Sequence, residues 1–371
     1  MRPAGGGLWL DGIGRQELYD GTLGRLVREH GVRGVCCVPA AVGSAGPSAY
    51  APHLAILAWR DLSPGAALAE LLAYDARWAA DLLRPLHEAS GGADGQVSVA
   101  LDPRLAHDPD ASVAAARRLG RAVGRSNVLV AIPATLRGLG VVEECLAAGI
   151  GVHATHVYSV ERYVRVVESC FAGLERAVRA GRDPAPVAPV LSFAVDGLDA
   201  AVERRLREAD RGAAGAVRGR VAVASARIVR ELHGRLLGSA RWAGLARHGA
   251  RAPRLLWGTP FAPPYGNGTV RRAGYGARPS GSDLGLVAWD ALRAVPAPVG
   301  TRAAVRAEEG PLNERAAWEV LAALPGLGIC YRELATGLER GALARSGRCS
   351  QEARAAVAAA LCERRAYRDV A

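Results

Sequence analysis

The stretch GVHATHVYSVERYVRVVESCFAGLERAVRAG (151–181) decides the fold, because a short apolar run passes directly into an amphipathic one. Residues 151–159 have the length and apolar character of a buried strand. Gly181, followed closely by Pro184, predicts where the next helix ends. Within that helix, apolar residues recur at the i, i+3 and i+4 spacing of one buried face: Tyr163, Val166, Val167, Cys170, Phe171, Leu174 and Val178.

Similar apolar runs alternate with helical patterns on both sides of this unit. They lie at 8–13, 32–40, 96–102, 128–134, 189–197 and 254–259, with a weak run at 291–299. Together with 151–159 they make eight candidate strands. Strands that alternate with helices form parallel sheets, so the pattern predicts an α/β fold, a single (β/α)8 TIM-type barrel.

Three segments are expected to add to this barrel. Residues 41–95, between the second and third strands, contain helical patterns such as ALAELLAYDARWAADLLRPLHEA, and residues 312–367 form a helical C-terminal tail. Residues 260–283 follow the seventh strand and are rich in Gly, Pro and Arg, which predicts a mobile flap over the barrel mouth. We expect residues 1–371 to form one domain.

Charge and composition indicate which partners and which cell compartment to expect. The net charge is +11, but the arginines are scattered among acidic residues without a basic tail or RNA-binding signature, so no nucleic-acid partner is expected. No apolar run approaches the roughly 20 residues that span a bilayer, and the first residues lack a signal-peptide pattern. We therefore expect a cytoplasmic protein with no membrane partner. The seven cysteines show no metal-ligand spacing, so neither a disulfide framework nor a metal site is expected.

Four stretches carry a resemblance to a known family: LWLDGIGR (8–15), LLRPLHEASGGADGQVSVALDPRLAHD (82–108), GVHATHVYSVERY (151–163) and LLWGTPFAPPY (255–265). Through them, residues 6–367 resemble the transaldolases, particularly the longer actinobacterial form. The resemblance implies an eight-stranded α/β barrel and a homodimer or larger assembly. It also implies a reaction through a lysine that forms a Schiff base with the substrate carbonyl.

The resemblance breaks down at the residues of this reaction. The run VLVAIPAT (128–135) places Ala131 where the family carries its lysine, and all 47 Lys+Arg positions of the chain are arginine. Arginine cannot take over, because its guanidinium stays protonated. The family's glutamate, two asparagines and phosphate-binding arginine correspond here to Ala100, Val38, His153 and Gly197. Its aspartate, threonine and serine remain as Asp11, Thr155 and Ser192.

The same correspondence predicts the barrel mouth, since strand residues alternate between two faces. The predicted site residues are Asp11, Cys36, Asp102, Ala131, His153, Thr155, Ser192, Asp196 and Trp257, with Arg293 as an anion anchor. His156 is expected to point away from His153. Small or apolar replacements predict a pocket that is roomier and less polar than a sugar-phosphate site, suited to a more hydrophobic substrate.

His153 and Asp11 are the candidate catalytic residues. Imidazole titrates near neutral pH and could act as a general acid or base, while Asp11 could orient it or carry a second proton. Other readings stay open: His153 as a hydrogen-bonded filler or a metal ligand, and Asp11 as a relic held by hydrogen bonds. The expected opposite direction of His156 argues against a metal. Cys36 is either a nucleophile without an adjacent base or a small core residue.

These residues lead to three hypotheses about function. The first is a cofactor-independent enzyme of specialised biosynthesis, which condenses, cyclises or isomerises a small carbonyl-type substrate by noncovalent acid/base catalysis. The second is a catalytically silent binding or scaffold protein, and the third is residual transaldolase or aldolase activity on sugar phosphates. A deep open mouth lined by Asp11 and His153 favours an enzyme, and a filled mouth favours a scaffold.

Overall fold

A curled parallel sheet forms the centre of the computed structural model, which describes residues 7–44, 46–195, 197–209, 217–258, 284–288 and 312–368. The strands pair in chain order, and the eighth pairs with both the seventh and the first, so the sheet closes on itself. Their bounds are β1 Gly7–Asp11, β2 Val32–Cys37, β3 Gln96–Ala100, β4 Val128–Pro133, β5 Val152–Val157, β6 Val190–Ala194, β7 Arg254–Gly258 and β8 Leu284–Ala288. This arrangement is that of a TIM-type barrel.

The first seven predicted strands are confirmed with shorter ends. The prediction for the eighth is wrong, because the strand that closes the barrel is β8, at Leu284–Ala288, ahead of the predicted run. The apolar run LGLVAW (284–289) directly follows the Gly-, Pro- and Arg-rich segment 260–283 and was not recognised as a strand, although β8 is as long as β1, β3, β6 and β7. Residues 291–299 and the predicted flap at 260–283 lie outside the described residues.

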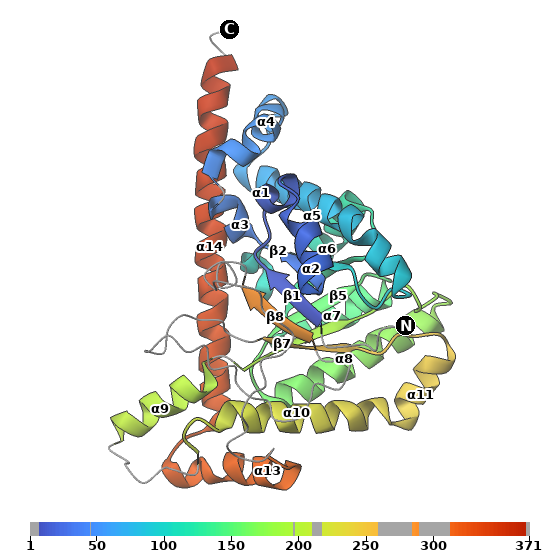
Figure 1. The fold of residues 1–371 in the computed structure, drawn as a ribbon, viewed down its shortest axis with the longest axis vertical. Helices are drawn as coiled ribbons and strands as arrows, with labels where there is room; N and C mark the ends of the chain where they lie inside the picture. Colours follow the sequence, from blue (N-terminus) through green and yellow to red (C-terminus); the bar gives the residue numbers. More distant parts are fainter. Residues whose placement is uncertain are drawn as a thin grey trace.

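Helices surround the sheet (Figure 1). Those before β5 are α1 Arg15–Tyr19, α2 Thr22–His30, α3 Pro39–Ser44, α4 Gly46–Trp59, α5 Pro64–Ala89, α6 Pro109–Val123 and α7 Gly138–Ala147, with the 3-10 turn η1 Pro103–His107. Those after β5 are α8 Val160–Arg179, α9 Leu198–Glu208, α10 Val221–Leu237, α11 Ala240–Arg247, α13 Glu314–Ala323 and α14 Tyr331–Arg368, with the 3-10 turn η2 Pro325–Leu327. The helical excursion between strands 2 and 3 (α3 to α5) and the helical tail are thus confirmed.

Helix α8 shows why the sequence folds this way. The Ser159 hydroxyl accepts the backbone N–H of Arg162 at 3.1 Å and caps the first turn. The chain leaves the helix through Gly181, whose φ of 70° favours glycine. Tyr163 and Phe171 on the predicted face are at most 1% exposed and belong to the core between sheet and helices.

A small separate group of apolar side chains from five strands fills the inside of the barrel: Trp9, Cys36, Leu129, Val190 and Leu256. The Trp9 ring lies against Gly34 on the neighbouring strand, where any Cβ would collide with it. A barrel interior filled by side chains in this way is a packed core, and sites in such barrels lie at the carboxyl ends of the strands.

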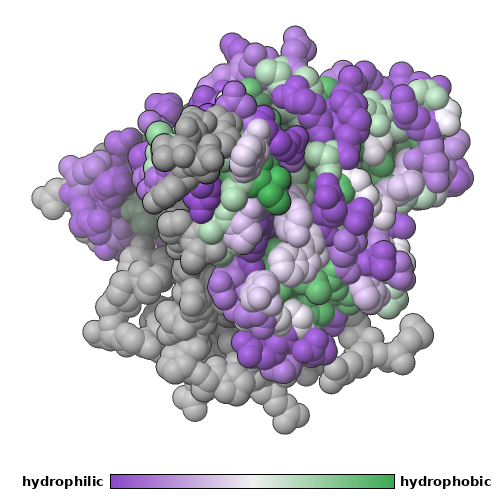
Figure 2. Space-filling view, turned by 90° about the horizontal axis from the view of Figure 1, so that it is seen from above, coloured by the Kyte–Doolittle hydropathy of each residue, from purple (hydrophilic) through white to green (hydrophobic). Residues whose placement is uncertain are grey.

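Several arginines on the outer surface pair with carboxylates. Arg125 contacts Asp81 at 2.7 Å, and Arg241 contacts Glu175 at 2.6 Å. The face in Figure 2, seen from the top of Figure 1, is mostly hydrophilic where its residues are described. Such exposed pairs each contribute little to stability. Within the described residues, no helix combines the length and apolar character needed to cross a membrane.

Candidate active site

A cavity of about 360 Å³ lies at the carboxyl ends of the strands, inside the barrel. Its polar or titratable lining residues are Asp11, Cys36, Ser98, His153, Thr155, His156, Tyr158, Ser192 and Ser346. The rest of the lining is small or apolar and includes Val38, Ala100, Ala131, Pro133 and Leu343. A largely apolar pocket with a few convergent polar groups is the usual form of a small-molecule site. Lysine and arginine are absent from the lining formed by the described residues.

Asp11 ends β1 and faces this cavity. Burial raises the pKa of its carboxyl from 3.8 to about 6, and a hydrogen bond from the Gly12 backbone N–H opposes the rise. Burial removes water from the carboxylate, and the surrounding protein offers few hydrogen bonds in its place, so the neutral acid is favoured. Asp11 therefore changes its protonation state near physiological pH, as a general acid or base must.

His153 lies deeper, on β5, and is 1% exposed. Its Nδ1 is 2.8 Å from the Ser98 hydroxyl and its Nε2 is 2.5 Å from the Ser192 hydroxyl. The Trp9 ring packs edge-on against the imidazole at a centroid distance of 5.7 Å. Burial lowers the pKa of His153 to about 3, with a smaller contribution from His156. The ring is thus a neutral, fully hydrogen-bonded bridge, a geometry that favours the filler reading over proton transfer to a ligand.

His156 also faces the cavity, and the prediction that it points away from His153 is wrong. The pairing of β5 with β6 shifts between Ala154 and Val157, and His156 has a φ of 61°, which breaks the alternation of side chains. Its Nδ1 is 2.9 Å from the Thr155 hydroxyl, and its Nε2 is 3.5 Å from the Ser346 hydroxyl. Burial, with the nearby Arg345, lowers the pKa of His156 to about 4. Positive φ at a histidine has no signal in the sequence.

Cys36 is the neighbour of Asp11 across the β1–β2 pairing. It lines the cavity at 5% exposure. Burial and the nearby Asp11 raise the pKa of its thiol well above 9, although Ser98 hydrogen-bonds to it. A thiol that remains protonated is a poor nucleophile, so the geometry favours the small core residue of the two readings.

Helix α14 covers the cavity with Leu343 and Ser346, which the sequence did not predict as site residues. In Figure 1 it is the long red helix along one side of the barrel. Glu339 binds Arg162 on α8 at 2.9 Å, and Arg354 binds Asp102 at 3.0 Å. These two ion pairs tie α14 to elements that end at the cavity.

Asp102 does not line the cavity, contrary to the prediction. Its carboxylate accepts the Arg104 backbone N–H at 3.1 Å and begins η1, besides binding the side chains of Arg104 and Arg354. These partners hold the pKa of Asp102 below its usual range against the opposing effect of burial. The strand alternation from Ala100 does not reach Asp102, because β3 ends at Ala100.

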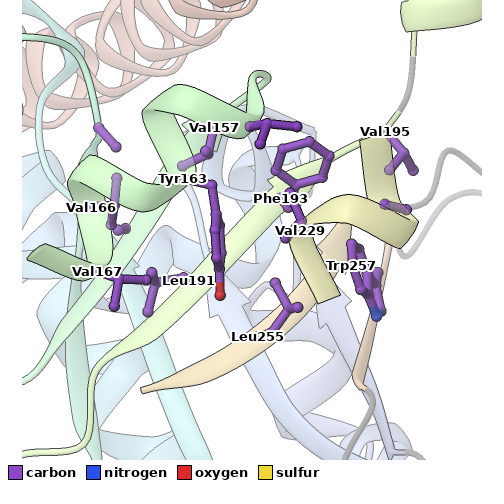
Figure 3. Close-up of a cluster of buried hydrophobic side chains, with 14 of the residues drawn as sticks. Val157, Tyr163, Val166, Val167, Leu191, Phe193, Val195, Val229, Leu255 and Trp257 are labelled. Carbon is purple, nitrogen blue, oxygen red and sulfur yellow. The ribbon is translucent and has the colours of Figure 1, made fainter. Parts of the chain in front are cut away.

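Trp257 also departs from the prediction. It lies on the outer face of β7 among the apolar side chains that pack between sheet and helices, with its ring 6.1 Å from that of Phe193 (Figure 3). Its neighbours Leu256 and Gly258 face the barrel interior instead. The remaining predictions, Asp196 and Arg293, lie outside the described residues. Groups of three or more His, Cys, Asp or Glu able to hold a metal are absent from the described part of the chain.

Comparison with known proteins fits this arrangement. Residues 8–238 match the family model described as Transaldolase/Fructose-6-phosphate aldolase. The chain belongs to this family. Relatives named Transaldolase include one from Acidothermus cellulolyticus, 42% identical over 259 residues that cover 69% of each chain, and one from Thermobifida fusca, 43% identical over 259 residues that cover 69% of this chain and 70% of the relative. Transaldolase 1 of Streptomyces coelicolor is 36% identical over 370 residues, covering 95% of this chain and 92% of the relative.

Within this transaldolase family member, the structure brings most of the predicted site together. The cavity lining includes the predicted residues Asp11, Cys36, Ala131, His153, Thr155 and Ser192. Ala131 faces the cavity from β4 with a methyl group where the resemblance implies a lysine. The chain has no lysine side chain, since all 47 Lys+Arg positions are arginine.

Proposed function

We propose that the chain is an enzyme that moves protons on a small carbonyl compound without a phosphate group, with Asp11 as the catalytic residue and no covalent lysine intermediate. The observation that carries the proposal is the Asp11 carboxyl, which faces an apolar cavity of about 360 Å³ with a pKa raised to about 6. A group that titrates near the working pH has the best balance of basicity and available conjugate base. His153 acts as a positioning residue that holds Ser98 and Ser192 in the cavity floor.

The lining supports a substrate without an anionic group rather than a sugar phosphate. Phosphate sites are built from arginine, lysine or helix N-termini, and the described lining contributes no arginine or lysine. A carboxylate at Asp11 would also repel a phosphate. Transaldolase or aldolase activity on sugar phosphates, the activity in the names of the relatives, is therefore the weaker candidate.

Exchange of carbon-bound hydrogen with solvent tests the proposal without knowledge of the natural substrate. Uncharged ketones such as acetophenone and cyclohexanone are incubated with the protein in deuterated buffer, and deuterium next to the carbonyl is measured by NMR. We expect exchange above the buffer rate, increasing as pH rises through about 6 because the base form of Asp11 abstracts the proton. Asp11→Asn should reduce the rate to background. An unchanged rate in Asp11→Asn would remove the proposal.

A binding protein without catalysis is the second candidate, favoured by the complete hydrogen bonding of the neutral His153 ring. The same experiment separates the two. Ketones that bind, as measured by calorimetry, but exchange no hydrogen would support the binding protein. Binding together with exchange that depends on Asp11 would support the enzyme.

A further inference from the structure

Asp11 differs from Asp75 and Asp102 in having no cationic partner among the described residues. Asp75 is 2% exposed and binds Arg15 at 2.6 Å. Asp102 binds Arg354 at 3.0 Å. Within the part of the chain that the structure describes, the Gly12 backbone N–H is the polar group that stabilises the Asp11 carboxylate. Buried carboxylates in proteins are normally paired, so an unpaired one that faces a cavity leaves room for a charge from outside the chain.

The other titratable groups that face the cavity are uncharged at neutral pH. Cys36 on β2 has a raised thiol pKa, whereas His153 and His156 on β5 have lowered imidazole pKa values. Tyr158 lies at the rim of the same lining. On α14, the charged group near the cavity is Arg345, an exposed side chain that acts on His156. Asp11 is thus the one anionic group among the described lining residues.

We propose that the cavity binds an organic ammonium ion with an apolar body, and that its cationic head pairs with the Asp11 carboxylate. The apolar body would contact the small and aliphatic lining residues Val38, Ala100, Ala131 and Leu343. This inference rests on the proposed function in taking the same cavity as the substrate site. It adds the class of ligand, an amine, and does not require that any proton transfer be catalysed.

Electrostatics favours a cation here despite the net charge of +11. Charges on exposed arginines are screened beyond roughly 8 Å at physiological ionic strength, whereas a buried contact is screened much less. Many of those arginines are also paired with carboxylates on the surface, as Arg176 is with Glu144 at 2.5 Å. The local carboxylate therefore decides which charge the cavity accepts.

Matched probes that differ only in charge test the inference. Benzylamine, benzyl alcohol and benzoate share one apolar body and are titrated calorimetrically into the full chain at pH 7.5. We expect the amine to bind at least about tenfold more tightly than the alcohol, which corresponds to about 1.4 kcal/mol, with benzoate weakest. Asp11→Asn should remove the preference, so that the amine no longer binds more tightly than the alcohol. Asp110→Asn, an exposed aspartate on α6, is the matched control and should keep the preference.

A pH titration of the wild-type chain keeps the test decisive if Asp11→Asn does not fold. Amine affinity should fall as pH drops through about 6, because protonated Asp11 carries no charge, while alcohol affinity stays constant. Equal affinities of amine and alcohol, a preference that survives in Asp11→Asn, or no binding of the amine would each overturn the inference. Failure here with intact Asp11-dependent hydrogen exchange would leave the proposed function standing. Amine binding without exchange would overturn the proposed function alone.

Discussion

His153→Asn should be less stable than wild type, and the size of this difference in the free energy of unfolding should depend on pH. The imidazole has a pKa lowered to about 3 in the folded protein and about 6.5 in the unfolded chain. As pH falls below 6.5, the unfolded chain binds a proton that the folded protein does not, so the wild type loses stability. Between pH 7.5 and pH 5.0 this loss amounts to about 2 kcal/mol, from 1.36 kcal/mol for each pH unit below 6.5.

Asparagine keeps a donor and an acceptor near Ser98 and Ser192 but does not titrate. His153→Asn should therefore be less stable than wild type at pH 7.5, and the deficit should shrink by about 2 kcal/mol at pH 5.0. Urea denaturation at both pH values measures it. Phe171→Leu, a core change without a titratable group, is the control and should show the same deficit at both pH values. A pH-independent deficit in His153→Asn would refute the neutral, buried assignment of this ring.

Three further substitutions test other parts of the structure. Asp75→Asn should lower the free energy of unfolding by about 3–5 kcal/mol in urea denaturation, because the buried Arg15 loses its counter-charge. Glu339→Gln should speed amide hydrogen exchange in the part of α14 that covers the cavity, because its ion pair with Arg162 is lost. Ala131→Lys should place a primary amine in the cavity and give an adduct with dihydroxyacetone that borohydride traps at residue 131.

Each of these has a result that would count against it. An Asp75→Asn variant as stable as wild type would mean that Arg15 finds water or another partner. Exchange in α14 that is unchanged in Glu339→Gln would mean that its apolar contacts alone hold it over the cavity. For Ala131→Lys, wild type is the control. Absence of the adduct at residue 131 would place that side chain outside reach of a bound carbonyl.

Regular periodicity made most of the fold predictable. Seven strands and the helical segments follow directly from apolar runs and amphipathic stripes, as α8 illustrates with Tyr163 and Phe171. Asp11 and Thr155 could be assigned to the cavity from the family correspondence, and both line it. The strand β8 was missed because its apolar run lies directly after the segment predicted as a flap, and the run at 291–299 was chosen instead.

The errors in the site arise where alternation stops or where distant segments meet. His156 turns into the cavity through a positive φ and a shift in strand pairing. Asp102 lies beyond the end of β3 and is drawn toward Arg354 on α14. Ser346 lies 190 residues after His156 in the chain and reaches the cavity from α14. Local sequence patterns do not predict a contact between residues so far apart. Side chains alternate along β7 as expected, but Trp257 lies on the outer face of the strand and not on the predicted inner face.

Asp11 faces an apolar cavity, has no cationic partner among the described residues, and is predicted to titrate near neutral pH. Carbon-13 NMR of protein labelled at the aspartate carboxyl carbons measures this directly, with the Asp11 signal assigned by its absence in Asp11→Asn. The account predicts a titration midpoint of about 6. A midpoint near the ordinary value of 3.8 would mean that the carboxyl is solvated or paired, and would contradict both the proposed proton transfer and the proposed ammonium site.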